Sequence, residues 1–301
     1  MKPTLYISTI VAALALLSGC SDDFTPTSLD FEREPVILAE LEVGALPVIS
    51  VSSTFSNPEE EFFPTGDDLP SGTGTRPNLS NLAPGGVKNK EMRFQRSFGD
   101  LSNIWVTESF RITEGSSYSL EADFSPVGMS TIFATTTAPV SGRVESLPEE
   151  VTLGQQDSYT FSLQLSDLDL EDNYYHVIPY LGNTSQALSR AAFTIDHQGT
   201  SDIFELSHVD GILIDINDSD NERRFDFSIN ASELLSSNPS YIYLRVKTVA
   251  QEYYDFHRSL TLQAESSVGT FDAPVIAEGN ILRGQGIFTA FTSRIDSIRV
   301  R

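Results

Sequence analysis

The chain has almost no cysteine, a single tryptophan and few basic residues. Its one cysteine, Cys20, leaves no partner for an intramolecular disulfide, so the fold depends on the size of its core. The 301 residues are enough for one large or two medium cores. Asp and Glu number 42 against 19 Lys and Arg, and the formal net charge is −23. This excess repels phosphate backbones, so we expect no nucleic-acid partner; it reflects either plain solubility or attraction to cations and basic peptides.

Long apolar runs are also absent, apart from one near the start of the chain. The uncharged run Leu5–Leu17 follows Lys2, and its length is typical of a signal peptide rather than of a membrane span. Leu17-Ser18-Gly19-Cys20 comes directly after it and resembles a bacterial lipobox. That resemblance implies cleavage after residue 19 and thioether lipidation of Cys20. The alternative is an ordinary secretory signal with a chance cysteine.

The segment after this cysteine is short, polar and acidic. We expect residues 1–19 to be the signal peptide and residues 20–34 to be a lipidated tether. Within the tether, Ser21, Asp22 and Asp23 resemble the signal of serine and acidic residues that sends Bacteroidota lipoproteins to the outer face of the outer membrane. The implied location is the outer membrane, with the lipid on Cys20 as anchor and the protein facing the cell exterior.

Apolar and polar residues alternate through most of the remaining chain, which indicates strands with one buried face. The clearest runs are Tyr118–Phe124, Ser158–Leu165, Arg224–Ile229 and Ile242–Lys247. The turn residues Glu114–Ser117 predict a hairpin between two such runs. Neighbouring residues of a strand point to opposite faces, so we expect either Tyr174 or Tyr175 to point outward.

Helical periodicity is rare. The best candidate is Gln251–Ala264, where Tyr253, Phe256, Leu260 and Ala264 recur at spacings of three and four. One helix among many strands predicts an all-β fold of two β-sandwich, immunoglobulin-like domains, with one short helix in the second. We place the domains at residues 35–139 and 140–301. The loop Ser56–Gly86, rich in Pro, Gly, Asp and Asn, is either disordered or a contact surface.

Two short motifs could be mistaken for ligand sites. Gly284-x-Gly286 lacks a third glycine, since Thr289 stands there, and a strand-like run follows, so we expect a turn leading into a closing strand. The acidic stretch Asp215–Asp226 has oxygen ligands at calcium-loop spacing, but Asp220 occupies the position that needs glycine. A solvated turn between strands is the alternative that we favour.

No arrangement in the sequence predicts catalysis. The four histidines, His176, His197, His208 and His257, contain no pair at the helical spacing of a zinc protease. There is no G-x-S-x-G nucleophile elbow. We therefore expect no catalytic residue, no metal site and no cofactor, and we expect the protein not to be an enzyme.

Several short motifs along the chain resemble one family of proteins. They are Gly115–Leu120, Ala134-Thr135-Thr136 leading to Pro139, Asn173-Tyr174-Tyr175, Tyr253-Tyr254, Gly279-Asn280-Ile281 and Gly284–Phe288. With the lipobox, these resemble the Bacteroidota lipoproteins grouped as the DUF4249 family. The stretch Val87–Phe94 departs from the family's usual small-residue step, which leaves the strand order there open.

The resemblance implies a role at the cell surface rather than a reaction. Proteins of this kind are often encoded beside TonB-dependent outer-membrane transporters, which implies an accessory or substrate-capture role in transport. The alternative is a structural or adhesin-like envelope lipoprotein. The residues that we assign to a candidate interaction surface are Asn280, Ile281, Gly284, Gly286 and Phe288.

Overall fold

The computed structural model describes most of the chain beyond residue 33. The described residues are 34–54, 77–84, 86–88, 90–98, 101–152, 157–165, 174–182, 189–190, 193–196, 202–216, 224–266 and 276–301. All of them belong to one compact unit, formed by Arg33–Thr54 and Phe62–Arg301. Over these residues the secondary structure is mainly β-strand, which confirms the all-β class.

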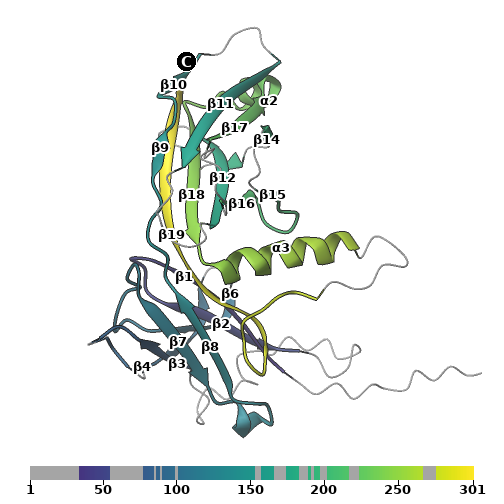
Figure 1. Cartoon of the computed structure of the whole chain (residues 1–301). Helices are drawn as coiled ribbons and strands as arrows, with labels where there is room; N and C mark the ends of the chain where they lie inside the picture. The colour runs from purple at the N-terminus through teal and green to yellow at the C-terminus, as the bar shows by residue number, and fades with distance from the viewer. Residues whose placement is uncertain are drawn as a thin grey trace, which may run out of the picture. The chain divides into compact units, whose positions relative to one another are not determined.

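The largest sheet has 11 strands and unites the beginning and the end of the described chain (Figure 1). Its main path runs β15 (Asp202–Glu205), β16 (Ile212–Asp215), β12 (Tyr174–Gly182), β18 (Tyr241–Val249), β19 (Gln285–Val300), β1 (Pro35–Glu42), β2 (Val48–Ser53), β6 (Leu101–Val106) and β5 (Arg93–Phe98). Two short strands lie off this path: β10 (Glu150–Val151) pairs with β19, and β13 (Ser189–Arg190) pairs with β12.

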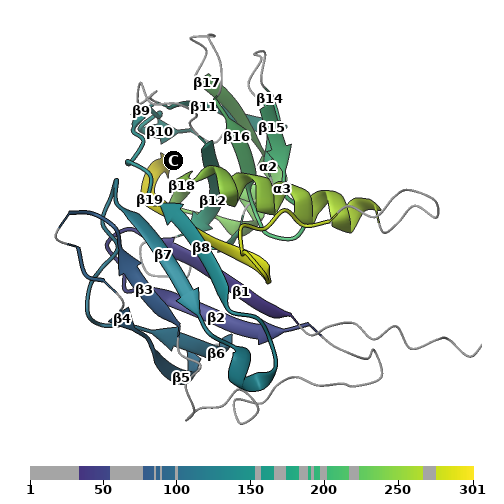
Figure 2. The ribbon, with the colours of Figure 1, turned by 60° about the horizontal axis from the view of Figure 1, so that its bottom comes forward.

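Two smaller sheets of four strands each complete the strand inventory of the described residues. One runs β14 (Phe193–Asp196), β17 (Arg224–Asn230), β11 (Ser158–Leu165) and β9 (Val144–Ser146). The other runs β4 (Lys90–Glu91), β3 (Asn78–Asn81), β7 (Ser117–Ala122) and β8 (Ile132–Thr137). Each packs its apolar face against a different part of the large sheet, which gives two sandwich-like cores (Figure 2).

Strand β19 belongs to both cores. Its first half lies parallel to β1, and its second half lies antiparallel to β18. Phe288 is completely buried in the core beneath β7 and β8, and Ile298 is completely buried in the core beneath β11 and β17. The large sheet therefore contains strands from both predicted domains, 35–139 and 140–301, and that division stays a prediction.

The glycine-rich turn before β19 is confirmed as a turn leading into a strand. Gly286 has a φ of +96°, and a Cβ added to it would lie 2.0 Å from the carbonyl oxygen of Ile37. Gly279 approaches Gly286 as closely, at 2.1 Å by the same measure. Only residues without a side chain allow β1, β19 and the segment before β19 to lie this close together.

The predicted helix is present as α3 (Gln251–Ser266), and the described chain has a second helix that we did not predict, α2 (Ala231–Ser237). The side chain of Asn230 accepts a hydrogen bond from the backbone N–H of Ser232, and Glu233 stands in the first turn. This Asn-x-x-Glu pattern is a capping signal that the sequence already contained. A short 3-10 helix, η1 (Ser125–Val127), precedes β8.

The predicted hairpin at Glu114–Ser117 is wrong. Gly115 does form a turn, with a φ of +68°, but the strands before and after it belong to different sheets. The intervening segment crosses between the sheets because Ile112 is buried and exchanges backbone hydrogen bonds with Gly44 and Ala45. The hairpin partner of β6 is β5, through Leu101 and Phe98.

The expectation that Tyr174 or Tyr175 points outward is also wrong. The two rings do lie on opposite faces of β12, but both are buried. Tyr175 packs in the core beneath β11 and β17, and Tyr174 packs against Tyr254 of α3, with ring centroids 4.9 Å apart. Alternation places side chains on two faces, but it does not reveal that a helix covers the second face.

The strand β3 also corrects the predicted loop Ser56–Gly86. Within this predicted loop, β3 pairs with β7, and its residue Leu79 is fully buried. Residues 56–76 and Gly85 of that loop lie outside the described residues, as do Cys20–Asp23 and the acidic stretch between Ile216 and Arg224. The acidic stretch is flanked by strands, as expected, but β16 and β17 belong to different sheets.

Candidate functional site

Helix α3 presents a mixed polar and apolar face to the large sheet. Its buried side chains are Tyr253, Tyr254, Phe256, His257, Ser259 and Thr261. Of the four apolar positions predicted for this face, only the first two, Tyr253 and Phe256, are buried. Opposite them, β12 and β18 contribute the buried side chains of His176 and Lys247, which are paired across the strands. The helix therefore covers titratable groups as well as apolar ones.

Tyr253 is the centre of the first branch of this polar network. Its hydroxyl oxygen lies 3.0 Å from Lys247 Nζ and 2.8 Å from His176 Nδ1. The second ring nitrogen of His176, Nε2, lies 2.8 Å from the carbonyl oxygen of Asp210. A carbonyl can only accept, so Nε2 of His176 holds the proton and Nδ1 accepts the hydrogen bond from Tyr253. Donation therefore runs from Lys247 through Tyr253 and His176 to the backbone.

The surroundings of His176 keep its imidazole neutral. Burial is the main cause that lowers its pKa to about 3, and the nearby charge of Lys247 lowers it further. Gly211 has a φ of +105°, and a Cβ there would lie 2.7 Å from Nε2 of His176. A glycine is thus needed for the loop before β16 to bring the Asp210 carbonyl onto the ring.

The second branch runs along the helix from Thr261 to Glu40 of β1. The hydroxyl of Thr261 lies 3.0 Å from His208 Nδ1, His208 Nε2 lies 2.8 Å from His257 Nδ1, and His257 Nε2 lies 3.1 Å from Glu40 Oε1. The backbone N–H of Ser207 donates to the same Thr261 hydroxyl. An ionised carboxylate accepts, so with neutral imidazoles donation runs from Thr261 through both histidines to Glu40.

Glu40 connects the two branches. Its other carboxylate oxygen lies 3.9 Å from Lys247 Nζ. Burial by itself raises the pKa of Glu40, but the hydrogen bond from His257 and the charge of Lys247 lower it below its usual range. Burial also lowers the pKa of Lys247, against the opposing effect of Glu40. The network therefore holds one carboxylate and one ammonium whose charges compensate each other.

Three of the four histidines meet in this network, which sequence reasoning did not foresee. The fourth, His197, lies outside the described residues. His208 and His257 are stacked with ring centroids 5.1 Å apart, yet the described residues contain no group of three or more His, Cys, Asp or Glu arranged to hold a metal ion. The arrangement is one of mutual hydrogen bonds, and it holds α3 on the sheet.

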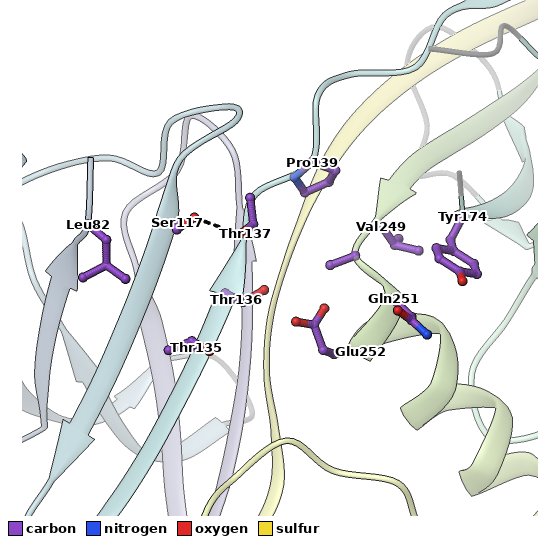
Figure 3. A pocket seen from close by; sticks show the side chains of 11 residues that line it. Leu82, Ser117, Thr135, Thr136, Thr137, Pro139, Tyr174, Val249, Gln251 and Glu252 are labelled. Carbon is purple, nitrogen blue, oxygen red and sulfur yellow. Dashed lines mark hydrogen bonds between the residues drawn. The ribbon is translucent and has the colours of Figure 1, made fainter. Parts of the chain in front are cut away.

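An open pocket of about 600 Å³ lies at the beginning of α3, beside this network (Figure 3). The residues that line it come from β7, β8 and the segments around them on one side and from β12, β18 and the first turn of α3 on the other: Leu82, Ser117, Thr135, Thr136, Thr137, Pro139, Tyr174, Val249, Ala250, Gln251 and Glu252. None of the network's histidines, and neither Lys247 nor Tyr253, is among them.

Among the described residues that line the pocket, Glu252 is the one with a charged side chain. Burial raises its pKa, and the charge of Asp255 raises it further. Thr136 is almost fully buried, and its hydroxyl oxygen has no hydrogen-bond partner among the described residues. In Figure 3 this hydroxyl points across the pocket toward the side on which Glu252 lies. The Glu252 carboxylate can accept hydrogen bonds from a cationic or neutral donor in the pocket, whereas the Thr136 hydroxyl oxygen is buried away from solvent.

The residues predicted as an interaction surface lie next to this pocket but mainly serve the fold. Phe288 and Ile281 are buried in the core. Asn280 donates to the backbone oxygens of Thr135 and Phe288, at 3.1 and 2.7 Å, and accepts from the N–H of Phe288 at 2.9 Å. A Cβ on Gly284 would meet the carbonyl of Pro35 at 2.8 Å. Their role in an interaction stays a prediction.

No described helix is both long enough and apolar enough to cross a membrane. The fold and the two features around α3 define an all-β protein with a self-satisfied polar network next to an open pocket. The sequence matches the model of a family described as a domain of unknown function (DUF4249) over residues 31–295, so the chain belongs to that family. No curated protein matches the chain.

Proposed function

We propose that this protein is a lipid-anchored, surface-exposed outer-membrane protein that acts without catalysis as an accessory or substrate-capture component of a TonB-dependent transport system. The observation on which the proposal rests is the lipobox-like string Leu17–Cys20, followed at once by Ser21, Asp22 and Asp23. The lipid would confine the protein to one membrane, and the tether would separate that membrane from a body whose first strand begins at Pro35.

The arrangement of the titratable groups supports the non-catalytic part of the proposal. A general base or nucleophile must reach a substrate within hydrogen-bond distance. His176, Tyr253 and Lys247 are instead buried and bonded to one another. The nearby pocket offers one carboxylate, Glu252, without a histidine, lysine or cysteine among its lining residues.

Membrane confinement supports the accessory part. Two proteins held in the same membrane meet at a high effective concentration, so a contact of modest area is sufficient between them. The family resemblance points to transporters as neighbours. The negative charge of the chain, −23, would favour a partner surface or a substrate with basic groups.

The anchor is tested by replacing the proposed lipid-bearing residue. Cys20→Ala should abolish incorporation of labelled fatty acid and release the protein from the membrane fraction, whereas Ser18→Ala should leave both unchanged. Fatty-acid labelling and membrane retention of the Cys20→Ala variant would refute the lipobox interpretation.

The partner is tested by purifying the tagged protein from membranes in mild detergent. We expect a TonB-dependent transporter to be recovered in near-equal amount, and a deletion strain to grow more slowly on the transported nutrient. Recovery of the protein alone, with normal growth of the deletion strain, would instead favour a structural or adhesin-like envelope role.

A further inference from the structure

Strand β8 is the edge strand of its four-stranded sheet, and part of its outer edge lines the pocket. Backbone groups of one residue in a strand point to the same side, and successive residues alternate. Phe133 exchanges both of its backbone hydrogen bonds with Leu282, on the side away from β7. Two and four residues further, Thr135 and Thr137 must therefore also direct their backbone N–H and C=O groups away from β7.

The hydrogen bonds at the end of β8 agree with this alternation of backbone directions. The backbone N–H of Ala138 donates to Ser116, on the side of β7. The carbonyl of Thr135 accepts from the side chain of Asn280 on the outer side. The N–H of Thr135 and both backbone groups of Thr137 face the pocket, and none of them is hydrogen-bonded to a described residue.

The chain itself shows that this edge accepts an extended segment. Leu282 pairs with Phe133 in antiparallel fashion, and the side chain of Asn280 takes the next position beside Thr135. Among the described residues, the coverage of this edge ends there, and the pocket begins. An added strand could continue along β8 past Thr137 at the usual separation of paired strands, about 4.8 Å.

The far side of the pocket determines which side chains such a segment would present. Glu252 and Gln251 stand in the first turn of α3 and line the pocket, and none of the described residues that line it is basic. A lysine or arginine would meet the Glu252 carboxylate and lower its raised pKa. An anionic or acidic segment would be repelled by this carboxylate and by the net charge of −23.

We propose that the pocket between β8 and the first turn of α3 is a peptide-binding site, which receives an extended basic segment of a partner protein by strand addition to β8. Hydrogen bonds to Thr135 and Thr137 would supply affinity without regard to sequence, and Glu252 would select a basic side chain. This inference deepens the proposed accessory role by naming the kind of partner, but its geometry does not depend on the lipid anchor.

The test uses the full-length protein in mild detergent and a phage-displayed library of short random peptides as the probe. We expect wild-type protein to enrich peptides that combine β-formers with lysine or arginine. Thr137→Pro removes an outward N–H and the side-chain hydrogen bond to Ser117, but it leaves the backbone pairing with β7 intact, because proline is tolerated where an edge N–H faces solvent. The Thr137→Val control loses the same hydroxyl, so the two variants differ in the N–H. Thr137→Pro should weaken the best synthetic peptide about tenfold, whereas Thr137→Val, which keeps the N–H, should not.

A charge variant tests the other side of the pocket. Glu252→Gln should weaken the same peptide about threefold to tenfold, while Glu121→Gln, the same charge change at an exposed position of β7, should have no effect. In an added strand, only every second backbone N–H of the peptide faces β8. N-methylation of the residues whose N–H groups face β8 should abolish binding, whereas N-methylation of the residues between them should not.

Four results would overturn the proposal. The first is that wild-type protein enriches no peptide, and the second is that the best peptide binds wild-type and Thr137→Pro protein equally. The third is that acidic peptides are enriched as strongly as basic ones. The fourth is that the protein alone sediments as a dimer, which Thr137→Pro dissociates. The last would mean that a second copy occupies the edge. None of these results would affect fatty-acid labelling at Cys20, so failure of this inference and failure of the proposed anchor are distinguishable.

Discussion

Strands β12 and β18 are buried on both faces, and the two faces are filled in opposite ways. Toward β11 and β17 the side chains are apolar: Tyr175, Val177, Ile242 and Leu244 meet Phe161 and Phe227 in one continuous core. Toward α3 the same two strands present His176 and Lys247, beside the apolar Tyr174 and Val249. Neighbouring residues of these strands thus belong either to an apolar core, on the face that we call the dry face, or to a hydrogen-bonded network, on the face that we call the polar face.

The difference shows that burial has different consequences on the two faces. On the dry face, each side chain stabilises the fold in proportion to the area it removes from water, whatever its neighbours. On the polar face, each buried polar group is tolerated only because it has a hydrogen-bond partner. Removing that partner therefore destabilises the fold by more than the net contribution of the hydrogen bond to stability. The predictions below test this contrast.

The largest effect should come from the dry face. Phe227 is fully buried, and its ring stacks with that of Phe161 at a centroid distance of 5.7 Å. Phe227→Ala should reduce the free energy of unfolding by about 3–5 kcal/mol, through lost burial and the cavity left behind. Urea denaturation measures this loss, and it should not depend on pH. Leu235→Ala on α2, at an exposed position, should change stability by less than about 0.5 kcal/mol.

The polar face should dominate the acid response. The unfolded chain binds a proton at histidine near pH 6.5, whereas folded His176 binds one only near pH 3. Between these values the unfolded state holds more protons, so the free energy of unfolding falls as the pH drops, by up to about 1.4 kcal/mol per pH unit from this group. His176→Gln should flatten the pH dependence of the denaturation midpoint between pH 6 and 4. An unchanged slope would show that His176 is not buried as a neutral group.

A smaller effect should follow from removing one hydroxyl. Tyr253→Phe leaves Lys247 and His176 without their shared partner and should cost about 1–3 kcal/mol, although it removes a single atom. Thermal unfolding followed by circular dichroism measures it. Tyr243→Phe is the matched control, because Tyr243 is only partly buried and its hydroxyl makes no comparable bonds in the network; it should have little effect. Equal behaviour of the two variants would remove the distinction between the faces.

The smallest effect should come from replacing the buried ammonium. Lys247→Met removes a charge whose burial is unfavourable, and the Glu40 carboxylate that loses this partner is 37% exposed and keeps its hydrogen bond to His257, so stability should change by less than about 1 kcal/mol. A loss as large as that of Phe227→Ala would show that the ion pair with Glu40 itself stabilises the fold.

Much of the secondary structure was predictable because it depends on local spacing. The alternating run Ser158–Leu165 is β11 residue for residue, and the helical spacing after residue 250 is α3. Helix α2 was missed although Asn230 and Glu233 signalled it. The hairpin at Gly115 was wrong, because a turn is local whereas the sheet to which the next strand belongs is not.

The candidate site could not be predicted to the same extent. Glu40 and His257 lie 217 positions apart in the chain, and His176 and Tyr253 lie 77 apart, so no motif connects them. The pocket posed the same difficulty, because one side is formed by residues between Leu82 and Pro139 and the other by Tyr174 and residues 249–252. Thr135 did fall within a stretch singled out for its family resemblance, but nothing in the sequence indicated which way its backbone groups point.

By itself, the sequence determined the all-β class, the position of α3, the negative charge and the lipobox-like string, since each depends on composition or on neighbours within a few residues. Only the tertiary structure decided which histidines meet, that both faces of β12 are covered, and that the outer edge of β8 opens into a pocket. The physical reason is that a strand's alternation assigns side chains to two faces, whereas long-range pairing and packing decide what covers each face and which edge remains open.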